Sequence, residues 1–312
     1  MSALYHTPVL AKELINELLK DRPSRVVDAT LGGGGHALEM LRRAPQEMQL
    51  IGIDRDAEAI AAAAERLKAF EQRVIILQGD FRNLDKLLDE AGIAAVEAVY
   101  ADLGVSSHQI DTAERGFSYL KDGPLDMRMD RNSTTTAATL LQNLSSDELA
   151  KIFQSYGEER LARRIAKRIE RERRHRPLTR TFDLVEIVSA VVPRPGRIKS
   201  LSRIFQALRI AVNDEMAALA DFLSTALRVL TPGGKLAIIS YHSLEDRQVK
   251  RFFMQHEKGC VCPPDVPMCI CGRQSELSVL TRKAVPPGET EIQNNPRARS
   301  AKLRIAQKRI NG

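Results

Sequence analysis

The fold of this chain is decided by the stretch Val26-Val27-Asp28-Ala29-Thr30-Leu31-Gly32-Gly33-Gly34-Gly35-His36, which is followed by Leu50-Ile51-Gly52-Ile53-Asp54. The pattern predicts a buried strand, a four-glycine turn, a helix and a second buried strand that ends in a carboxylate. Glycine has no Cβ, so the turn can pass close to a ligand. Asp54 can then accept hydrogen bonds from two ribose hydroxyls. The sequence therefore predicts a nucleotide-binding α/β fold.

The spacing of the glycines separates two classes of adenosine-containing cofactor. A dinucleotide is usually bound by G-x-G-x-x-G at the start of a helix, where backbone amides hold the pyrophosphate. Here Gly32 to Gly35 are consecutive and His36 follows, so that spacing is not met. S-adenosylmethionine (SAM) has no phosphate and fits the run better. A glycine-rich turn without a ligand is the alternative.

The composition points to a cytoplasmic enzyme. The chain has 312 residues, enough for one large domain or two modest ones. It contains no run of about twenty apolar residues, and Met1 to His6 do not resemble a secretory signal. Its four cysteines are confined to Cys260–Cys271, which argues against a disulfide framework.

Positive charge is concentrated in one segment. The whole chain has a net charge of +7, whereas residues 151–210 hold sixteen Lys and Arg, mostly Arg, against six acids. This segment therefore carries +10, and the remainder of the chain carries −3. Arginine binds phosphate through two parallel hydrogen bonds and stacks on bases. The segment predicts contact with nucleic acid, with solvated helix faces as the alternative.

Strand-like and helical patterns alternate along the first third of the chain. Four strand-like runs are separated by helical patterns at 36–43, 57–69 and 82–91, which predicts a parallel sheet covered on both faces. The strand-like runs are Val26–Asp28, Leu50–Ile53, Val74–Leu77 and Val96–Ala101.

The alternation stops after Asp102 and resumes much later. Apolar residues spaced three or four apart predict one long helix over Ile204–Leu230, followed by a strand at Lys235–Ser240. We therefore expect residues 1–105 and 202–312 to form a discontinuous sheet domain. Residues 106–201 are expected to form an inserted, mostly helical domain, in which Ser145 and Glu148 match the pattern of a capping box.

Polar residues follow every strand of the expected sheet. They are the glycine run, Asp54, Gly79-Asp80-Phe81 and Asp102, and cofactors bind at the carboxyl ends of such strands. Asp102 is the candidate catalytic residue. The alternative is that Asp102 is an acidic residue with a purely structural role in a turn. His36 either touches the cofactor or only opens the first helix.

His242 follows the resumed strand and faces the same edge of the expected sheet. It is a second catalytic candidate, acting either as a general base or, in the reading we favour, as a hydrogen-bonded orienting group.

The cysteines form two close pairs. Four thiolates could close a tetrahedral zinc site, and reduced cysteines in a proline-shaped loop are the alternative. The residues are Cys260, Cys262, Cys269 and Cys271.

Together these motifs resemble the RsmH (MraW) family of bacterial ribosomal small-subunit RNA (cytosine-N4)-methyltransferases. The likeness covers nearly the whole chain. It is carried by His6-Thr7-Pro8-Val9-Leu10, Asp28 to His36, Asp102-Leu103-Gly104-Val105-Ser106-Ser107, Arg115-Gly116-Phe117-Ser118, Asp122 to Met129, Tyr156 to Arg160, Tyr241 to Arg247 and Asn295 to Ser300.

The resemblance implies a Rossmann-like SAM-dependent methyltransferase core that methylates N4 of a cytidine in the decoding region of 16S rRNA. It also implies that residues 106–201 are an inserted, mostly helical domain that recognises the substrate RNA. It implies 16S rRNA or the small ribosomal subunit as partner and no membrane, and it leaves a homodimer open. Some members lack the cysteine cluster, so zinc is not expected to serve the chemistry. The implied cofactor contacts are Gly34, Gly35, His36, Asp54, Phe81, Asp102 and Gln109.

Two further expectations concern the RNA. The arginine-rich helix should grip RNA phosphates through Arg163, Arg164, Lys167 and Arg168. The aromatic shelf for the target base should come from Phe117, Tyr119 or Tyr241, because no aromatic residue follows Asp102 directly. A nicotinamide-dependent oxidoreductase and a non-catalytic RNA-binding assembly factor are the rival functions.

Overall fold

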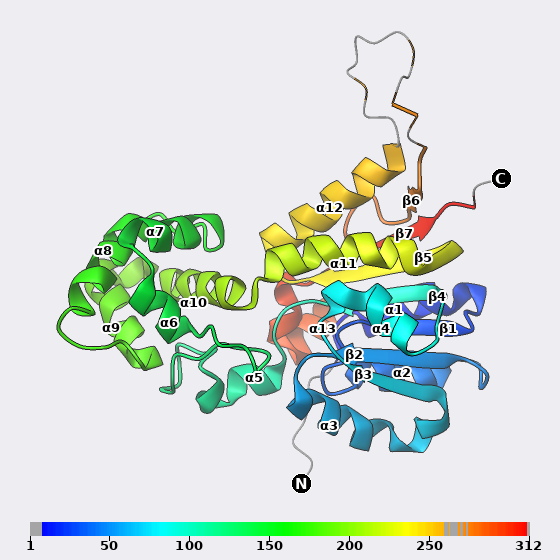
Figure 1. Ribbon diagram of the computed structural model, residues 1–312, viewed down its shortest axis with the longest axis horizontal. Coiled ribbons are helices and arrows are strands. Elements are labelled where there is room, and N and C mark those ends of the chain that lie inside the picture. The colour runs from blue at the N-terminus through cyan, green and yellow to red at the C-terminus, as the bar shows by residue number, and fades with distance from the viewer. Residues whose placement is uncertain (1–7, 259–261, 263–267, 269–270, 273, 311–312) are drawn as a thin grey trace. The chain divides into compact units, whose positions relative to one another are not determined.

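The computed structural model describes residues 8–258, 262, 268, 271–272 and 274–310. The chain divides into two compact units (Figure 1). The first, which we call the sheet unit, is built from Met1–Gly104 and Ala217–Gly312, and the second, the helical unit, is Val105–Met216. Each unit has its own hydrophobic core.

The sheet unit contains a seven-stranded sheet in the order β3-β2-β1-β4-β5-β7-β6. Strands β1 to β5 are parallel, and β7 is antiparallel to both β5 and β6. The strands are β1 Arg25–Asp28, β2 Gln49–Asp54, β3 Val74–Gln78, β4 Val96–Asp102, β5 Leu230–Ser240, β6 Leu277–Val279 and β7 Lys302–Lys308.

Helices cover both faces of this sheet, as the near-continuous apolar strands predict. One buried cluster joins the sheet to α4, α11 and α12, and another joins it to α1, α2 and α3. The helices are α1 Ala11–Leu18, α2 Gly35–Arg43, α3 Ala57–Leu67, α4 Leu84–Glu90, α11 Glu215–Val229, α12 Ser243–Lys258 and α13 Glu289–Asn294. The predicted α/β class is confirmed.

The helical unit packs its helices around a separate apolar cluster that includes Phe153, Ile165 and Leu208. The predicted capping box of Ser145 and Glu148 is present at the start of α7. The helices are α5 Ser107–Asp111, α6 Ala137–Asn143, α7 Ser146–Ser155, α8 Ala162–Glu172, α9 Thr181–Val191 and α10 Arg197–Asn213.

The single helix predicted over Ile204–Leu230 is wrong, because two helices occupy this stretch. Asp214 lies between α10 and α11 in the left-handed conformation, with φ 50° and ψ 40°. Aspartate tolerates that conformation better than most residues, and the apolar spacing continues across the break, so periodicity alone cannot reveal it.

The second boundary of the insertion also differs from residues 201/202. The helical unit extends to Met216, because Ile204, Phe205 and Leu208 of α10 are buried in its core.

Strands β6 and β7 are not among the strands predicted from the sequence. Leu303 and Ile305 of β7 are buried among the helices α1 to α3, while Arg304 between them pairs with Asp246 of α12. This alternation of apolar and charged residues is a strand signal.

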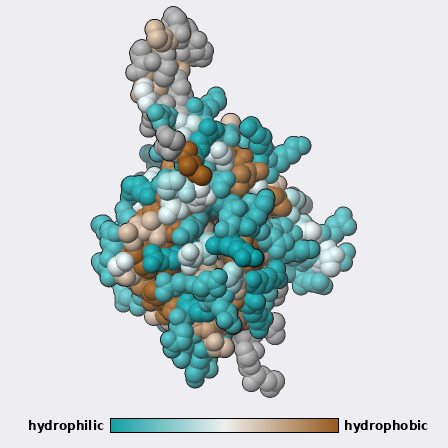
Figure 2. Space-filling view, turned by 90° about the vertical axis from the view of Figure 1, so that its right-hand side faces the viewer, coloured by the Kyte–Doolittle hydropathy of each residue, from teal (hydrophilic) through white to brown (hydrophobic). Residues whose placement is uncertain are grey.

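Hydrophilic residues cover most of the face seen in Figure 2, and the apolar residues there form small separate patches. Among the described residues, none of the helices combines the length and the apolar character needed to cross a bilayer.

Candidate cofactor site

The polar residues predicted to gather at one edge of the sheet follow strands that are parallel and adjacent. The glycine run follows β1, Asp54 ends β2, Asp80 follows β3, Asp102 ends β4 and Tyr241 follows β5. Because the carboxyl ends of parallel strands meet at one edge, these residues share it.

The glycine loop is shaped by positive backbone angles and close neighbours. Gly32 has φ 51° and Gly34 has φ 74°, angles that residues with a side chain rarely adopt. A Cβ on Gly34 would lie 3.3 Å from the Cβ of Ala63 in α3. The loop thus offers bare backbone at the edge of the sheet, as a cofactor with a methionine tail requires.

Asp54 fixes this loop from the neighbouring strand. Its Oδ2 accepts a hydrogen bond from the amide of Gly32 at 2.7 Å, and its Oδ1 accepts one from the amide of Asp56 at 2.9 Å. Burial raises the pKa of Asp54, and the two amides act in the opposite direction. Since a carboxylate offers about four lone-pair positions, these bonds leave acceptor capacity for the hydroxyls of a ribose.

Asp102 is held by Thr30 and Tyr241, which come from two other segments of the sheet unit. Its amide donates to Thr30 Oγ1 at 2.7 Å, and its Oδ1 accepts from the hydroxyl of Tyr241 at 2.9 Å. Its Oδ2 lies 3.6 Å from His36 Nδ1. Burial and the neighbouring Asp102 carboxylate raise the pKa of Tyr241, so its hydroxyl stays protonated and donates.

His36 uses its ring to connect the glycine loop to the segment before α1. Its Nε2 lies 2.8 Å from the carbonyl oxygen of Val9, and because a carbonyl can only accept, Nε2 carries the hydrogen. Burial lowers the pKa of His36, which favours the neutral ring. The ring therefore makes a structural hydrogen bond through Nε2.

A buried pair that the sequence analysis did not assign to the site lies next to it. Tyr100 donates its hydroxyl to Asp28 Oδ2 at 2.7 Å, and both residues are buried. Burial raises the pKa of Asp28 to about 6. Tyr100 stands two residues before Asp102 in β4, so both side chains lie on one face of that strand. That spacing is the signal that could have identified Tyr100.

His242 is locked at the start of α12. Its Nδ1 accepts a hydrogen bond from the amide of Glu245 at 3.4 Å, and its Nε2 lies 3.0 Å from Glu245 Oε1. Both ring nitrogens thus face Glu245. These contacts fix the position of the ring, and both roles of His242 stay predictions.

The remaining predicted cofactor residues use their side chains in local packing. Phe81 packs edge-on against Phe222 of α11, with ring centroids 4.9 Å apart. Gln109 belongs to the helical unit, where it closes a capping box with Ser106 at the start of α5. Among the candidate base shelves, Phe117 and Tyr119 contribute to the core of the helical unit, and Tyr241 bonds Asp102.

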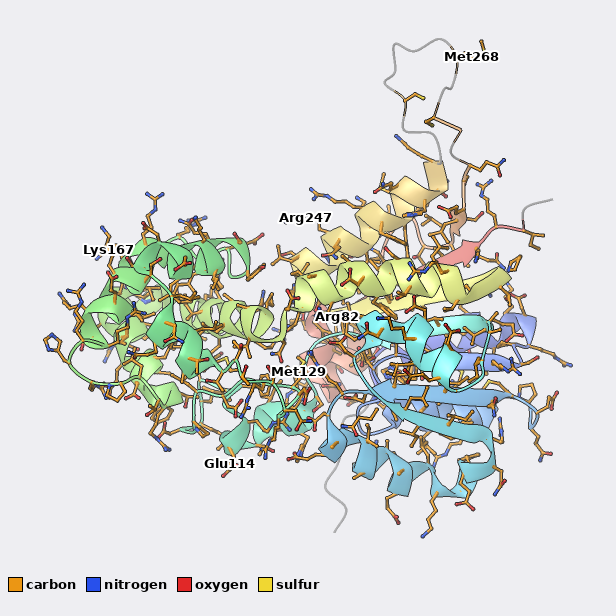
Figure 3. All side chains as sticks on the ribbon, in the orientation of Figure 1. Arg82, Glu114, Met129, Lys167, Arg247 and Met268 are labelled. Atoms are coloured by element: carbon orange, nitrogen blue, oxygen red, sulfur yellow. The ribbon has the colours of Figure 1, made fainter. Side chains whose placement is uncertain are left out.

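The predicted RNA-binding helix α8 exposes most of its cations. Arg163, Arg164 and Lys167 are exposed, and Lys167 is labelled in Figure 3. Arg168 differs, because its Nε lies 2.7 Å from Glu172 Oε1. Ile165 and other apolar residues of α8 are buried on the opposite face.

Several other arginines of this segment support the structure of the helical unit. Arg173 donates to the carbonyl oxygens of Leu141 and Leu144 at the end of α6. Arg176 pairs with Asp183 and Glu186, Arg180 with Asp122, and Arg209 with Glu215. The concentration of arginine seen in the sequence therefore combines structural cations with exposed ones.

The predicted zinc site falls largely outside the described part of the chain. Cys260 and Cys269 lie outside the described residues, and Cys262 and Cys271 are half-buried. The four-cysteine site stays a prediction.

Comparison with known proteins identifies the family. The model of the MraW methylase family matches residues 3–309. Two relatives called ribosomal RNA small subunit methyltransferase H are similar over nearly their full length. The protein from Symbiobacterium thermophilum is 48% identical over 309 residues, covering 98% of this chain and 97% of the relative.

The protein from Heliobacterium modesticaldum is 46% identical over 309 residues, covering 97% of this chain and 98% of the relative. The resemblance inferred from the motifs is confirmed. This chain belongs to the MraW methylase family and is a SAM-dependent methyltransferase.

Proposed function

We propose that this methyltransferase transfers the methyl group of SAM to N4 of a cytidine in the decoding region of 16S rRNA. The names of the relatives support ribosomal RNA of the small subunit as the substrate class. The substrate is the RNA or the small ribosomal subunit, which the enzyme would meet in the cytoplasm. The helical unit serves as the substrate domain, and its exposed cations on α8 contact RNA phosphates.

The cofactor is proposed to lie against the glycine loop. Gly34, Gly35 and His36 would contact it through their backbone, and Asp54 would bind the ribose hydroxyls. Phe81 and Asp102 would complete the contacts in the sheet unit. Gln109 of the helical unit is kept as a contact implied by family resemblance. When bound, SAM supplies an electrophilic methyl group on a positively charged sulfur.

The observation that carries the chemistry is the fixed carboxylate of Asp102. The lone pair of the cytosine N4 amine is delocalised into the ring, so the amine is a weak nucleophile. A carboxylate that accepts a hydrogen bond from N4–H orients the amine and stabilises it as the nitrogen pyramidalises. Tyr241 and Thr30 hold Asp102 for this role, since they bond its Oδ1 and its amide.

Nucleoside mass spectrometry tests this function. Small-subunit rRNA from cells without the protein should lack one N4-methylated cytidine that reappears when the gene is restored. Purified protein, SAM and small-subunit particles from the deficient cells should regenerate the same nucleoside. Naked rRNA in a parallel reaction distinguishes the two substrates. An unchanged nucleoside profile would support the non-catalytic assembly factor instead.

The four cysteines are proposed as a structural zinc site that is separate from methyl transfer. Thiolates are preferred zinc ligands. Elemental analysis of the purified protein should give about one zinc per chain. A chelator that changes neither the metal content nor the melting temperature would contradict this site.

A further inference from the structure

Helix α12 has a basic exposed surface, although its net charge is small. Its sequence holds four Lys and Arg against three acids, so its net charge is only +1. All four cations are exposed, whereas the three acids are buried or half-buried. The exposed cations, which we call the α12 stripe, are Arg247, Lys250, Arg251 and Lys258.

The acids of α12 are turned toward partners within the sheet unit. Glu245 accepts hydrogen bonds from the amides of Tyr241 and His242, and Asp246 pairs with Lys302 and Arg304 of β7. Glu257 accepts a hydrogen bond from the amide of Val279 and lies 3.7 Å from Arg282. None of these acids pairs with Lys250, Arg251 or Lys258.

The cations of the stripe lie along one side of the helix. At 3.6 residues per turn, positions 247, 250, 251 and 258 fall within an arc of about 100°. Val249 and Phe253, which are buried in the sheet core, lie on the opposite side. Lys250, Arg251 and Lys258 have no ion-pair partner among the residues that the structure describes. From residue 247 to residue 258 the stripe is about 16 Å long.

The stripe begins beside the candidate cofactor site. Tyr241, whose hydroxyl holds Asp102, stands two residues before the first residue of α12. Arg247, labelled in Figure 3, follows about one turn into the helix. Both the site and the stripe belong to the sheet unit, so their proximity does not depend on the helical unit.

We propose that the α12 stripe binds the phosphate backbone of the substrate RNA next to the target nucleotide. This inference rests on the proposed function, and it assigns to the methyltransferase core an RNA contact in addition to that of α8. A row of exposed cations, of which Lys250, Arg251 and Lys258 make no ion pair within the described residues, fits a polyanion whose charges repeat every few ångströms. The target base must leave its stack to react, and a core that holds the adjacent backbone would keep that base at Asp102.

The test compares two full-length double variants of equal charge change. The first is Lys250→Glu/Arg251→Glu in the stripe. The second is Lys20→Glu/Lys68→Glu, two exposed lysines without ion-pair partners in the described structure. Lys20 and Lys68 lie in the short helices that precede β1 and β3, at the opposite edge of the sheet. An RNA fragment of the 16S decoding region is the probe, and its Kd is measured across a salt series.

We expect the stripe variant to bind the RNA at least about tenfold more weakly and to reduce the salt slope by about 1.5, while the control binds like wild type. Both variants should bind SAM with unchanged affinity, which verifies that the core is folded. Equal RNA binding by the stripe variant and the control would overturn the inference, including the case in which the stripe serves a protein or a membrane.

The RNA-binding measurement is independent of methyl transfer. If wild-type protein binds the fragment through the stripe but methylates no cytidine, the proposed function is wrong, whereas RNA binding by the stripe is supported. If the protein methylates rRNA and the stripe variant keeps wild-type Kd and KM, the inference fails and the function stands.

Discussion

The carboxylates at the sheet edge and the exposed cations of α8 and α12 are polar residues of opposite kinds. The carboxylates of Asp54 and Asp102 accept hydrogen bonds from amides or hydroxyls within the sheet unit. Arg163 and Lys250, in contrast, are exposed and make no ion pair within the described structure. The carboxylates are fixed before any ligand binds, whereas the cations need a polyanion to compensate them. Single substitutions should therefore have large effects at the sheet edge and small, cumulative effects on the two helices.

The largest effect is expected for Asp102→Ala. Loss of the acceptor for N4–H should lower kcat by about 10²- to 10³-fold, the size seen when one preorganised hydrogen-bonding group is removed from an active site. Single-turnover methylation of rRNA with saturating SAM measures it. Asp102→Asn is the matched variant, because it preserves shape and removes the charge. Wild-type turnover by Asp102→Ala would show that Asp102 is only a structural acid.

The buried Asp28 should make stability depend on pH. Its pKa is about 6 in the folded chain against 3.8 for an ordinary aspartate, so the folded state binds the proton more tightly. Its contribution to stability is therefore greatest at low pH and is lost as pH rises from about 4 to 6. The loss amounts to about 3 kcal/mol.

Comparison with Asp28→Asn isolates this contribution. Between pH 4 and 6 the free energy of unfolding of the wild type should fall relative to that of the variant. Above pH 7 the difference between the two proteins should stay constant. Urea denaturation at each pH measures it. A difference that does not vary with pH would mean that Asp28 is not the titrating group.

A smaller effect is expected when the support of Asp102 is removed. Tyr241→Phe deletes the hydroxyl that donates to Asp102 Oδ1 and keeps the ring. One hydrogen bond contributes about 1 kcal/mol, so kcat should fall by about fivefold to tenfold. Because the ring is retained, the KM for RNA should stay near wild type. If Tyr241 is instead the shelf for the base, Tyr241→Phe will keep kcat and Tyr241→Ala will raise KM.

The sequence predicted those parts of the site that depend on neighbouring strands. The spacing of Gly32 and Asp54 follows from one β-α-β unit, and the structure joins them by a hydrogen bond. The bond between Tyr241 and Asp102 spans 139 residues and an inserted unit, so no local pattern predicts it. The sequence pattern does not reveal the break at Asp214, because its neighbours keep the apolar spacing of a continuous helix.

Counts of charged residues along the sequence were the least reliable predictor of which cations are exposed and available to RNA. They drew attention to residues 151–210, where Arg173, Arg176 and Arg180 are engaged in bonds within the helical unit. They gave α12 a net charge of only +1, although its three acids are buried or half-buried and its four cations are exposed. Burial and pairing decide which cations face solvent, and neither can be read from composition.

The smallest effects should come from single cations of α8, and there the comparison can be made within one helix. Arg163→Ala, Arg164→Ala and Lys167→Ala should each weaken RNA binding by a few-fold and reduce the salt slope by about 0.7 to 0.9, the contribution of one phosphate contact. Arg168→Ala should have less effect on RNA, because Glu172 already neutralises this arginine at 2.7 Å. Titration of the decoding-region fragment at several salt concentrations ranks the four variants. If Arg168→Ala weakens binding as much as the others, the ion pair must open in the complex, and pairing in the unbound protein would no longer separate structural cations from RNA-binding ones.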